Sequence, residues 1–351
     1  MPAPPAISAP RAADFAAAVV RWQKKHGRRN LPWRADGDPY KIWLSEVMLQ
    51  QTRAAAVIPY YQKFVRRWPD AASLARARPD SVMAAWSGLG YYARARNLHF
   101  AAKIFRRDGF PQTAARWREI PGVGRSTAAA IAVFSRGERA AILDGNVKRV
   151  LARAFAVRTA TNTPAGEKEL WAVAETLPPP SRDIRAYTQG MMDLGATVCV
   201  RASPKCGVCP LSSFCVARRR GLENTLPHRI SRGRTPLKNV AMALLLHQGR
   251  VFLEKRPPSG IWGGLRSLPE NESAAALKKE CGARLRCEFI LRDTGEFSHA
   301  FTHFRLRAKV LVWECAAAPA FSDGDGAWYE RRALPRAALP SPIKKFLQSL
   351  E

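Results

Sequence analysis

Four cysteines lie within seventeen residues of this chain of 351, and their spacing constrains the fold more than any other feature: Cys199, Cys206, Cys209 and Cys215. Thiols held this close in loops can bind a metal or a cluster, and they cannot all pair as relaxed disulfides. Structural zinc sites usually pair two short C-x2-4-C knuckles, whereas here one knuckle stands beside two longer loops. Cubane iron–sulfur clusters take four Cys thiolates. The spacing therefore suits a centre bulkier than zinc, such as a [4Fe-4S] cluster, and a zinc site or four free thiols are the alternatives.

The rest of the composition describes a globular chain without an export signal. Hydrophobic residues make up 47% of it, and the longest apolar runs are too short to span a membrane. The first eleven residues have neither a basic start nor an apolar core, so we expect a disordered tail at 1–11 and a cytoplasmic protein. Thiols stay reduced in that compartment, which suits a metal centre. Cys281, Cys287 and Cys315 fall outside the cluster spacing and are predicted to be ordinary buried thiols.

The formal net charge of +29 predicts a polyanionic partner. A basic surface attracts such a partner by Coulomb force and by the release of counterions. Binding to a membrane or to RNA would produce the same number, so charge alone does not identify the partner.

Hydrophobic periodicity divides the chain into two folded parts. Apolar residues recur at three- and four-residue steps through 12–216, which predicts an all-α domain. The polar, basic stretch 217–236 is predicted to be a linker. Beyond it, 237–351 contains a hairpin pattern and an alternating strand at 301–313, which predicts a smaller α+β domain. Among the expected helices are 42–54, 126–136 and 146–155.

Two glycine-containing motifs precede helices in the first domain. In Ile120-Pro-Gly-Val-Gly-Arg, Gly122 and Gly124 allow a tight turn that leaves free N–H groups at a helix N-terminus, a geometry that binds phosphate. A plain turn between helices is the alternative interpretation. In Leu-Asp-Gly-Asn, Asp144 follows a buried apolar pair, and either Asp144 or Asn146 could simply cap the next helix.

A carboxyl group also interrupts an apolar helical face at Glu46. Desolvation raises the pKa of a carboxyl group in such a place, so that it can act as an acid near neutral pH. A Glu that is paired with a cation is the alternative.

These motifs together resemble the endonuclease III and MutY family of DNA glycosylases. The cluster spacing follows MMDLGATVC, and WLSEVMLQQT, GLGYYARARN, PGVGR and LDGNVK extend the likeness over about 14–348. The resemblance implies that Glu46 protonates adenine and that the charge of Asp144 stabilises a sugar cation. It further implies DNA contacts and pocket roles for other residues. Leu49, Gln50, Gln51, Tyr91, Gly122, Gly124, Asn146 and Lys148 would contact DNA, and Arg34, Gln189 and Ser126 would line the adenine pocket.

The residue after PGVGR distinguishes two branches of this family. Bifunctional enzymes carry a Lys there, and its amine attacks the sugar to form a Schiff base. Here the position is Ser126, whose hydroxyl cannot form an imine. The resemblance therefore implies a monofunctional glycosylase that uses water.

The C-terminal domain resembles the MutT-like, or Nudix, domain of the same family, through the stretch 256–265. The paired carboxylates that would bind Mg²⁺ are missing at 278–283, so we expect a domain that reads DNA and does not hydrolyse nucleotides. In the family a Phe-Ser-His motif reads 8-oxoguanine. Phe301-Thr302-His303 matches it by context, with Thr in place of Ser, although Phe297-Ser298-His299 spells the motif literally.

The resemblance implies a nucleoid-associated monomer that removes adenine paired with 8-oxoguanine or guanine in double-stranded DNA. Two alternatives stay open at this stage. One is a bifunctional glycosylase and lyase for oxidised pyrimidines, against which Ser126 argues. The other is a non-catalytic iron–sulfur DNA-binding protein, against which the presence of both Glu46 and Asp144 argues.

Overall fold

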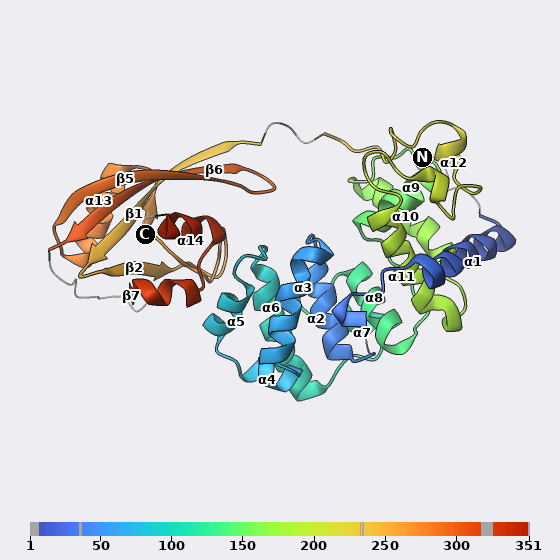
Figure 1. Ribbon diagram of the computed structural model, residues 1–351, viewed down its shortest axis with the longest axis horizontal. Helices are drawn as coiled ribbons and strands as arrows, with labels where there is room; N and C mark the ends of the chain where they lie inside the picture. Colours follow the sequence, from blue (N-terminus) through green and yellow to red (C-terminus); the bar gives the residue numbers. More distant parts are fainter. Residues whose placement is uncertain (1–6, 35–36, 232, 234, 317–325, 350–351) are drawn as a thin grey trace. The chain divides into compact units, whose positions relative to one another are not determined.

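A computed structural model describes residues 7–34, 37–231, 233, 235–316 and 326–349. Contacts divide the chain into two compact units (Figure 1). The first contains Met1–Ala75 and Phe100–Ser231, and the second contains Arg76–His99 and Arg232–Glu351. Among the described residues, no helix combines the length and the apolarity needed to cross a membrane.

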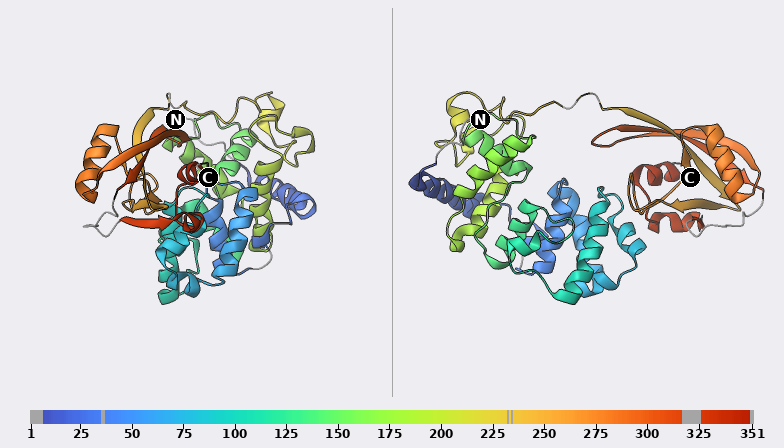
Figure 2. Two further views of the ribbon diagram at one scale, coloured as in Figure 1. Left: turned by 60° about the vertical axis from the view of Figure 1, so that its left-hand side comes forward. Right: turned by 180° about the vertical axis from the view of Figure 1, so that it is seen from behind.

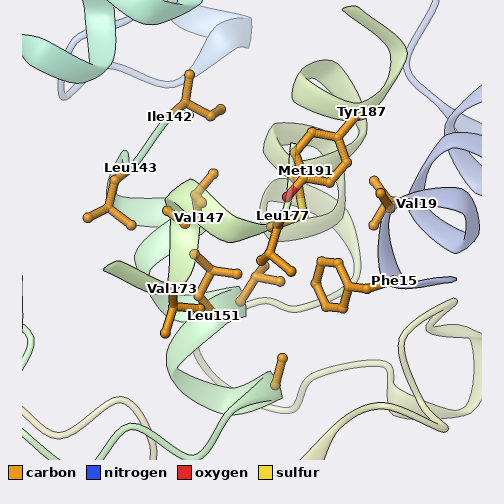
Figure 3. Packing of buried hydrophobic residues seen from close by; sticks show 14 of the residues in the cluster. Phe15, Val19, Ile142, Leu143, Val147, Leu151, Val173, Leu177, Tyr187 and Met191 are labelled. Carbon is orange, nitrogen blue, oxygen red and sulfur yellow. The ribbon is translucent and has the colours of Figure 1, made fainter. Parts of the chain in front are cut away.

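The first unit is helical, as predicted, and a hydrophobic core joins its N-terminal helix to the helices of residues 125–197. Figure 3 shows Phe15 and Val19 of this core beside Tyr187 and Met191. Its elements are α1 (Ala9–His26), η1 (Pro32–Arg34), α2 (Pro39–Leu49), α3 (Ala54–Arg67), α4 (Ala71–Arg76), α6 (Ala93–Asp108), α7 (Ala114–Trp117), α8 (Arg125–Arg136), α9 (Gly145–Ala154), α10 (Pro164–Thr176), α11 (Ser181–Thr197), η2 (Cys206–Val208) and α12 (Val216–Arg219); α4 and α6 extend across the division between the units.

Two glycines let α11 pack closely against its neighbours. A Cβ atom on Gly190 would lie 2.7 Å from Cγ1 of Val19 on α1, and one on Gly195 would lie 2.6 Å from Cβ of Asn146 on α9. Any larger residue would push these helices apart. The two glycines therefore hold α9, which begins directly after Asp144, at a fixed separation from α11.

The helix expected at 42–54 ends early. Helix α2 stops at Leu49, and Gln51 adopts φ +57°, a left-handed conformation that no helix can continue through. The next helix starts at Ala54. The prediction missed this break because no Gly or Pro marks it.

The ends of the first unit also differ from the predicted boundaries. Helix α1 begins at Ala9, inside the expected tail, and residues 1–6 lie outside the described residues. The expected linker begins with α12, and the N–H of Thr161 donates a hydrogen bond of 2.9 Å to the carbonyl of His228. Residues 217–231 thus belong to the first unit, while 232 and 234 lie outside the described residues. The division into domains at 216 and 237 stays a prediction.

The second unit contains a mixed sheet in the order β3-β2-β1-β6-β5, with β4 on β1 and β7 on β2. Figure 2 shows the strands of this sheet, coloured from yellow to red, from two further sides. Strands β1 and β2 form the predicted hairpin, whose turn places Gln248 and Gly249 at φ +47° and +72°. Strand β1 pairs with β6 in parallel. The elements are α5 (Pro79–Trp86), β1 (Leu237–His247), β2 (Arg250–Lys255), β3 (Arg266–Ser267), β4 (Glu270–Asn271), α13 (Ala274–Leu285), β5 (Phe289–Ala300), β6 (Arg305–Cys315), β7 (Gly326–Glu330), η3 (Arg331–Arg336) and α14 (Ser341–Gln348).

Helices α13 and α14 cover opposite faces of this sheet. Leu277 and Cys281 of α13 pack with Ala243 of β1 and Trp313 of β6. Phe346 of α14 contacts the other face, where its ring lies 5.9 Å from that of Phe297 on β5. The alternation of side chains along each strand assigns these residues to the two faces.

The strand expected at 301–313 begins later than predicted. Residues 301–304 form the turn between β5 and β6, closed by a 2.9 Å hydrogen bond from the N–H of Phe301 to the carbonyl of Phe304. We call this segment the β5–β6 turn. The preceding strand β5 was not expected, because its mixture of charged and small residues hides the alternation.

Residues 76–99 contact the sheet domain within the second unit. The hydroxyl of Ser87 donates to the carbonyl of Leu339 at 2.6 Å, and the ammonium of Lys255 lies 3.1 Å from the carboxylate of Asp80. The guanidinium of Arg96 also donates to the carbonyl of Gly263. These contacts explain why the segment groups with the C-terminal part of the chain.

Candidate active site and cluster loop

Glu46 lies on the last turn of α2, partly exposed between the buried residues Ser45 and Val47. The pKa of its carboxyl group is raised to about 8, chiefly by burial and in addition by the negative charge of Asp144, while Arg34 opposes the shift. A carboxyl group with this pKa holds its proton at neutral pH. The interpretation of Glu46 as a carboxylate paired with a cation is therefore disfavoured, and the residue has the properties of a general acid.

Asp144 is the N-cap of α9. One of its carboxylate oxygens accepts hydrogen bonds from the N–H groups of Asn146 and Val147, at 2.8 and 2.7 Å. Burial raises the pKa of Asp144, while these two hydrogen bonds, Arg149 and Lys148 lower it. Capping and a role in chemistry are compatible, because one oxygen accepts both backbone bonds and the other has no partner among the described residues. The site thus holds two carboxyl groups in different environments.

Ser126 fixes the segment that leads to Asp144. Its hydroxyl, at the start of α8, accepts a 2.9 Å hydrogen bond from the N–H of Leu143. The side chain at the position where bifunctional enzymes carry a Lys therefore joins α8 to the residue before Asp144. This contact places Ser126 beside the segment that leads to Asp144.

Asp193 is a site residue that the sequence analysis missed. Its carboxylate is fully buried and accepts two hydrogen bonds from the guanidinium of Arg34, at 2.7 and 3.2 Å, and one from the amide of Gln189 at 3.3 Å. Arg28 adds two more, from its N–H at 3.0 Å and its Nε at 2.8 Å. Asp193 thus brings the predicted pocket residues Arg34 and Gln189 together. Its position in the quoted MMDLGA, four residues after Gln189 and on the same helical face, was the available signal.

Arg34 and Gln189 each keep polar atoms unused. Nε of Arg34 is buried without a hydrogen-bond partner, and Oε1 of Gln189 accepts no hydrogen bond from the described residues. A buried, unpaired donor costs free energy unless a ligand or water satisfies it. These two atoms could therefore bind the edge of a base.

The break after α2 presents Gln51 to solvent, while the neighbouring Gln50 turns back onto the protein. The amide of Gln50 donates to the carbonyl of Gly122 at 3.1 Å and to the hydroxyl of Thr127 at 3.2 Å. Gly122, at φ +81°, and Gly124, the N-cap of α8, are exposed. The structure therefore joins Gln50 to the turn that contains Gly122 and Gly124.

Two further predicted DNA contacts take part in ion pairs or hydrogen bonds. The ammonium of Lys148 lies 3.0 Å from the carboxylate of Glu167, and the side-chain oxygen of Asn146 accepts from the guanidinium of Arg149 at 2.9 Å. The backbone N–H of Asn146 donates a hydrogen bond to the carboxylate of Asp144. In this conformation both side chains therefore have partners within the protein.

Tyr91 lies in the second unit, in a loop whose backbone leaves the ring exposed. It adopts φ +49° between Gly90, at φ +77°, and Tyr92, and 44% of its surface is accessible. The guanidinium of Arg94 lies 5.4 Å from the centre of the Tyr91 ring and 5.3 Å from that of Trp86. The ring is exposed, so it is available for the DNA contact that the resemblance implies.

Residues 199–215 form the cluster loop, and all four of its cysteines line one cavity. The cysteines are free thiols, and burial raises the pKa of Cys209 to about 11. Within the part of the chain that the structure describes, no group of three His, Cys, Asp or Glu side chains is arranged to hold a metal ion. Four thiols around a shared cavity fit the donor set of an iron–sulfur cluster.

Arg153 fixes the cluster loop to α9, and the sequence analysis missed it. Its guanidinium is buried and donates to the carbonyls of Val200, Arg201 and Leu226, at 2.7, 2.9 and 2.9 Å. It also lies 3.3 Å from Sγ of Cys199. The helix that begins after Asp144 therefore carries the main support of the loop.

The β5–β6 turn holds Phe301, Thr302 and His303, with the last two exposed. The ring of Phe301 stacks on Phe304 at 4.6 Å and contacts Trp262 at 5.6 Å, which fixes the base of the turn. Ser298 and His299, by contrast, lie within strand β5. The turn presents Thr302 and His303 as groups that a base could contact.

Acidic side chains of the sheet domain are paired with arginines. Glu254 lies 3.0 Å from Arg284, and Glu270 lies 2.8 Å from Arg256. Glu280 accepts from Asn271 at 2.7 Å. These acidic side chains thus have protein partners, and the sequence lacks the paired carboxylates at 278–283 that would bind Mg²⁺.

Comparisons with known proteins match both units. Residues 44–176 match the HhH-GPD superfamily base excision DNA repair protein family, and 240–349 match the NUDIX domain. The chain is 33% identical to the adenine DNA glycosylase of Buchnera aphidicola subsp. Acyrthosiphon pisum, over 96% of this chain and 97% of the relative. It is 32% identical to that of Mus musculus, over 96% and 78%. A thermostable thymine-DNA glycosylase is 30% identical with TM-score 0.53, over 59% of this chain and 95% of that structure.

Proposed function

Because this chain belongs to the adenine DNA glycosylase family, we propose that it removes adenine from double-stranded DNA with Glu46 as the acid and Asp144 as the stabilising anion. The observation that carries the proposal is the difference between the two carboxyl groups. Burial keeps the proton on Glu46 up to a pH of about 8. Burial also raises the pKa of Asp144, but there two backbone hydrogen bonds and two nearby cations act in the opposite direction, toward the anion. Pairs of titratable groups in different environments are typical of acid and anion roles.

The proposed reaction begins with an adenine that is flipped out of the duplex, at a cost of a few kcal/mol. Glu46 donates its proton to the adenine ring, so that the base can leave with the electrons of the glycosidic bond. The sugar is left as a cation, which the negative charge of Asp144 stabilises. Water then adds to the sugar, loses a proton, and leaves an abasic site.

Arg34 and Gln189 are proposed to read the edge of the flipped adenine. Each is anchored by Asp193 and keeps one polar atom free of protein partners. Anchored groups lose little conformational entropy on binding, so they favour one orientation of the base. Ser126 supplies no amine, which supports a monofunctional enzyme over one with lyase activity.

The proposed substrate is adenine paired with 8-oxoguanine, and also with guanine. Thr302 and His303 on the β5–β6 turn carry hydrogen-bonding groups that could contact the lesion, and the hydroxyl of Thr302 can both donate and accept. Binding to the genome would place this protein at the nucleoid, and one chain contains every residue that the proposal uses, consistent with a monomer.

The cluster loop is proposed to hold a [4Fe-4S] cluster on Cys199, Cys206, Cys209 and Cys215, which line one cavity. When bound, the cluster would supply structural cross-links among four segments of the loop. Arg201 and Lys205, which flank the ligands, would then face the DNA backbone from a fixed position.

A single-turnover assay tests the proposal. A duplex with 8-oxoguanine opposite adenine is incubated with excess protein, and we expect free adenine and an abasic site, with strand cleavage only after alkali. Borohydride should trap no covalent complex. A borohydride-trapped complex would instead support the bifunctional alternative, and no release of adenine would support a DNA-binding protein without catalysis.

A further inference from the structure

A groove of about 420 Å³ lies between strand β5 and helix α14 in the second unit. We call it the β5–α14 groove. The residues that line it are Glu296, Phe297, Ser298, His299, Ser341, Pro342, Lys345, Phe346 and Ser349. Neither the catalytic residues nor Thr302 and His303 belong to it.

Aromatic residues form the floor of this groove. Side chains alternate along β5, so Phe297 and His299 point toward α14, while Glu296 and Ser298 point toward the other face. The rings of Phe297 and Phe346 lie 5.9 Å apart, and a Cβ atom on Gly295 would lie 2.7 Å from Phe346. The helix is thus pressed onto the strand at one end of the groove, and the charged groups lie at the other.

The side chains of Lys345 and His299 lie at that end of the groove. Lys345 is exposed, and its ammonium makes no hydrogen bond or ion pair with any described residue. Burial lowers the pKa of His299, and the positive charge of Lys345 lowers it further. Glu296 also lines the groove, but it alternates with Phe297 and His299 along β5 and forms no ion pair with Lys345 among the described residues. An anion bound between Lys345 and His299 would be stabilised by both groups.

The groove continues into the β5–β6 turn. The ring of His299 lies 4.6 Å from that of Phe301, in an edge-to-face arrangement, and 6.1 Å from that of Trp262. A nucleotide that reaches Thr302 and His303 therefore brings its neighbouring backbone phosphates to the same side of the sheet.

We propose that the β5–α14 groove binds a backbone phosphate of the DNA strand that carries the lesion, through Lys345 and His299. The inference rests on the proposed reading of the lesion by the β5–β6 turn. The groove is continuous with that turn and open to solvent at Lys345. Both features favour a phosphate within a DNA strand over a free nucleotide. The groove would hold the strand in register while the turn contacts the base, as phosphate contacts do in other complexes.

The first test replaces Lys345 with Gln in the full chain and measures the dissociation constant for an 8-oxoguanine duplex at several salt concentrations. Loss of one phosphate contact should lower the salt slope by about 0.9 and weaken binding about fivefold at 0.15 M salt. Lys344→Gln is the matched control, because it removes the same charge from the adjacent residue, whose ammonium donates to the carbonyl of Pro335 at 3.1 Å. Equal slopes for both variants would contradict the proposal.

The second test locates the phosphate. Neutral methylphosphonates are placed one at a time along the lesion strand. For the wild-type protein, one position near the lesion should weaken binding about fivefold, and the same position should have no further effect on Lys345→Gln. If the two changes add at every position, Lys345 contacts no single phosphate and the proposal is wrong.

Two further readouts separate this inference from the proposed function. Excision of adenine should continue in Lys345→Gln, since the catalytic residues are unchanged. If the wild-type protein shows no preference for 8-oxoguanine, the reading of the lesion fails, whereas the methylphosphonate map still decides on the phosphate. If deoxyguanosine monophosphate at millimolar concentration shifts the His299 resonances, and no methylphosphonate matters, the groove binds free nucleotides and the inference is overturned.

Discussion

At the scale of single residues, the environment of each carboxyl group decides its chemical role. Glu46 is surrounded by apolar neighbours and a second negative charge, and both disfavour its anion. Asp144 is equally confined, but two backbone N–H groups donate to it. This difference in surroundings is why we propose the role of acid for Glu46 and that of anion for Asp144.

The raised pKa of Glu46 predicts a change in stability with pH. Its pKa is about 8 in the folded protein and 4.5 in a model peptide. Between these values the folded chain keeps a proton that the unfolded chain loses, so this residue lowers stability as pH rises. Glu46→Gln should therefore raise the thermal midpoint relative to the wild type, by an amount that grows from pH 5 to pH 8. A constant difference across this range would show that the pKa of Glu46 is not raised.

Asp144 allows capping and charge to be separated. Asn caps helices as well as Asp does, so Asp144→Asn should keep the stability within about 0.5 kcal/mol. Removing the charge should slow excision about a hundredfold or more, as loss of an electrostatic stabiliser does in other enzymes. Asp144→Ala should lose the same activity and, in addition, about 1 kcal/mol of stability. Normal excision by Asp144→Asn would exclude a role for the anion.

At the scale of elements, α9 connects Asp144 to the cluster loop within the first unit. Asp144 caps its N-terminus, while Arg153 on its last turn binds three carbonyls of the cluster loop and the segment that follows. Because a helix is stiff over this length, the cluster loop and Asp144 are held by the same rigid body. We expect damage to the loop to affect folding before it affects the chemical step.

The cysteine ligands provide the corresponding test. Cys206→Ser should lower iron content, soluble yield and DNA affinity together, since lost ligation is lost folding energy. The wild type should be brown, with about four irons per chain. Cys287→Ser, outside the cluster loop, is the control and should keep all three properties. Stoichiometric zinc without iron, in protein prepared without oxygen, would contradict the cluster.

Sequence predicts elements best where local signals mark their ends. The helices expected at 126–136 and 146–155 lie within one residue of α8 and α9, because Gly and Asp mark their starts. The break at Gln51 carries no such signal. Strand β5 was missed because its pattern is irregular, and the parallel pairing of β1 with β6 depends on contacts about 70 residues apart.

The same limit applies to the site. Glu46 and Asp144 lie in motifs to which a role could be assigned, whereas Arg153 lies in none and Asp193, although it is within MMDLGA, received no role. Asp193 is important because it accepts from Arg34, 159 residues away, and Arg153 because it binds Leu226, 73 residues away. Buried charges acquire their roles from distant partners, which no local pattern reveals.

At the scale of the whole molecule, catalysis and reading of the lesion are proposed for different units. Glu46, Asp144 and the cluster loop lie in the first unit, and the β5–β6 turn lies in the second. Excision and discrimination should therefore be separable by mutation.

Replacing both Thr302 and His303 with Ala tests this separation in the full chain. Loss of one or two hydrogen bonds to the lesion should cost about 1–3 kcal/mol of the preference for 8-oxoguanine:A over G:A. Binding to undamaged DNA should barely change, because phosphate contacts supply most of it. Ser298→Ala is the control. If only Ser298→Ala reduces the preference, the literal motif at 297–299 is the reader, and equal losses on both substrates would indicate a general DNA clamp.

The central claim is that Glu46 delivers the proton that releases adenine, and the single-turnover rate of Glu46→Gln tests it most directly. The amide keeps the size of the side chain and cannot donate a proton as an acid does. We predict normal binding of the 8-oxoguanine:A duplex and a rate about a hundredfold lower or more, while the wild-type rate falls as pH rises through about 8, where Glu46 loses its proton. Excision by Glu46→Gln at a rate near that of the wild type would contradict the account.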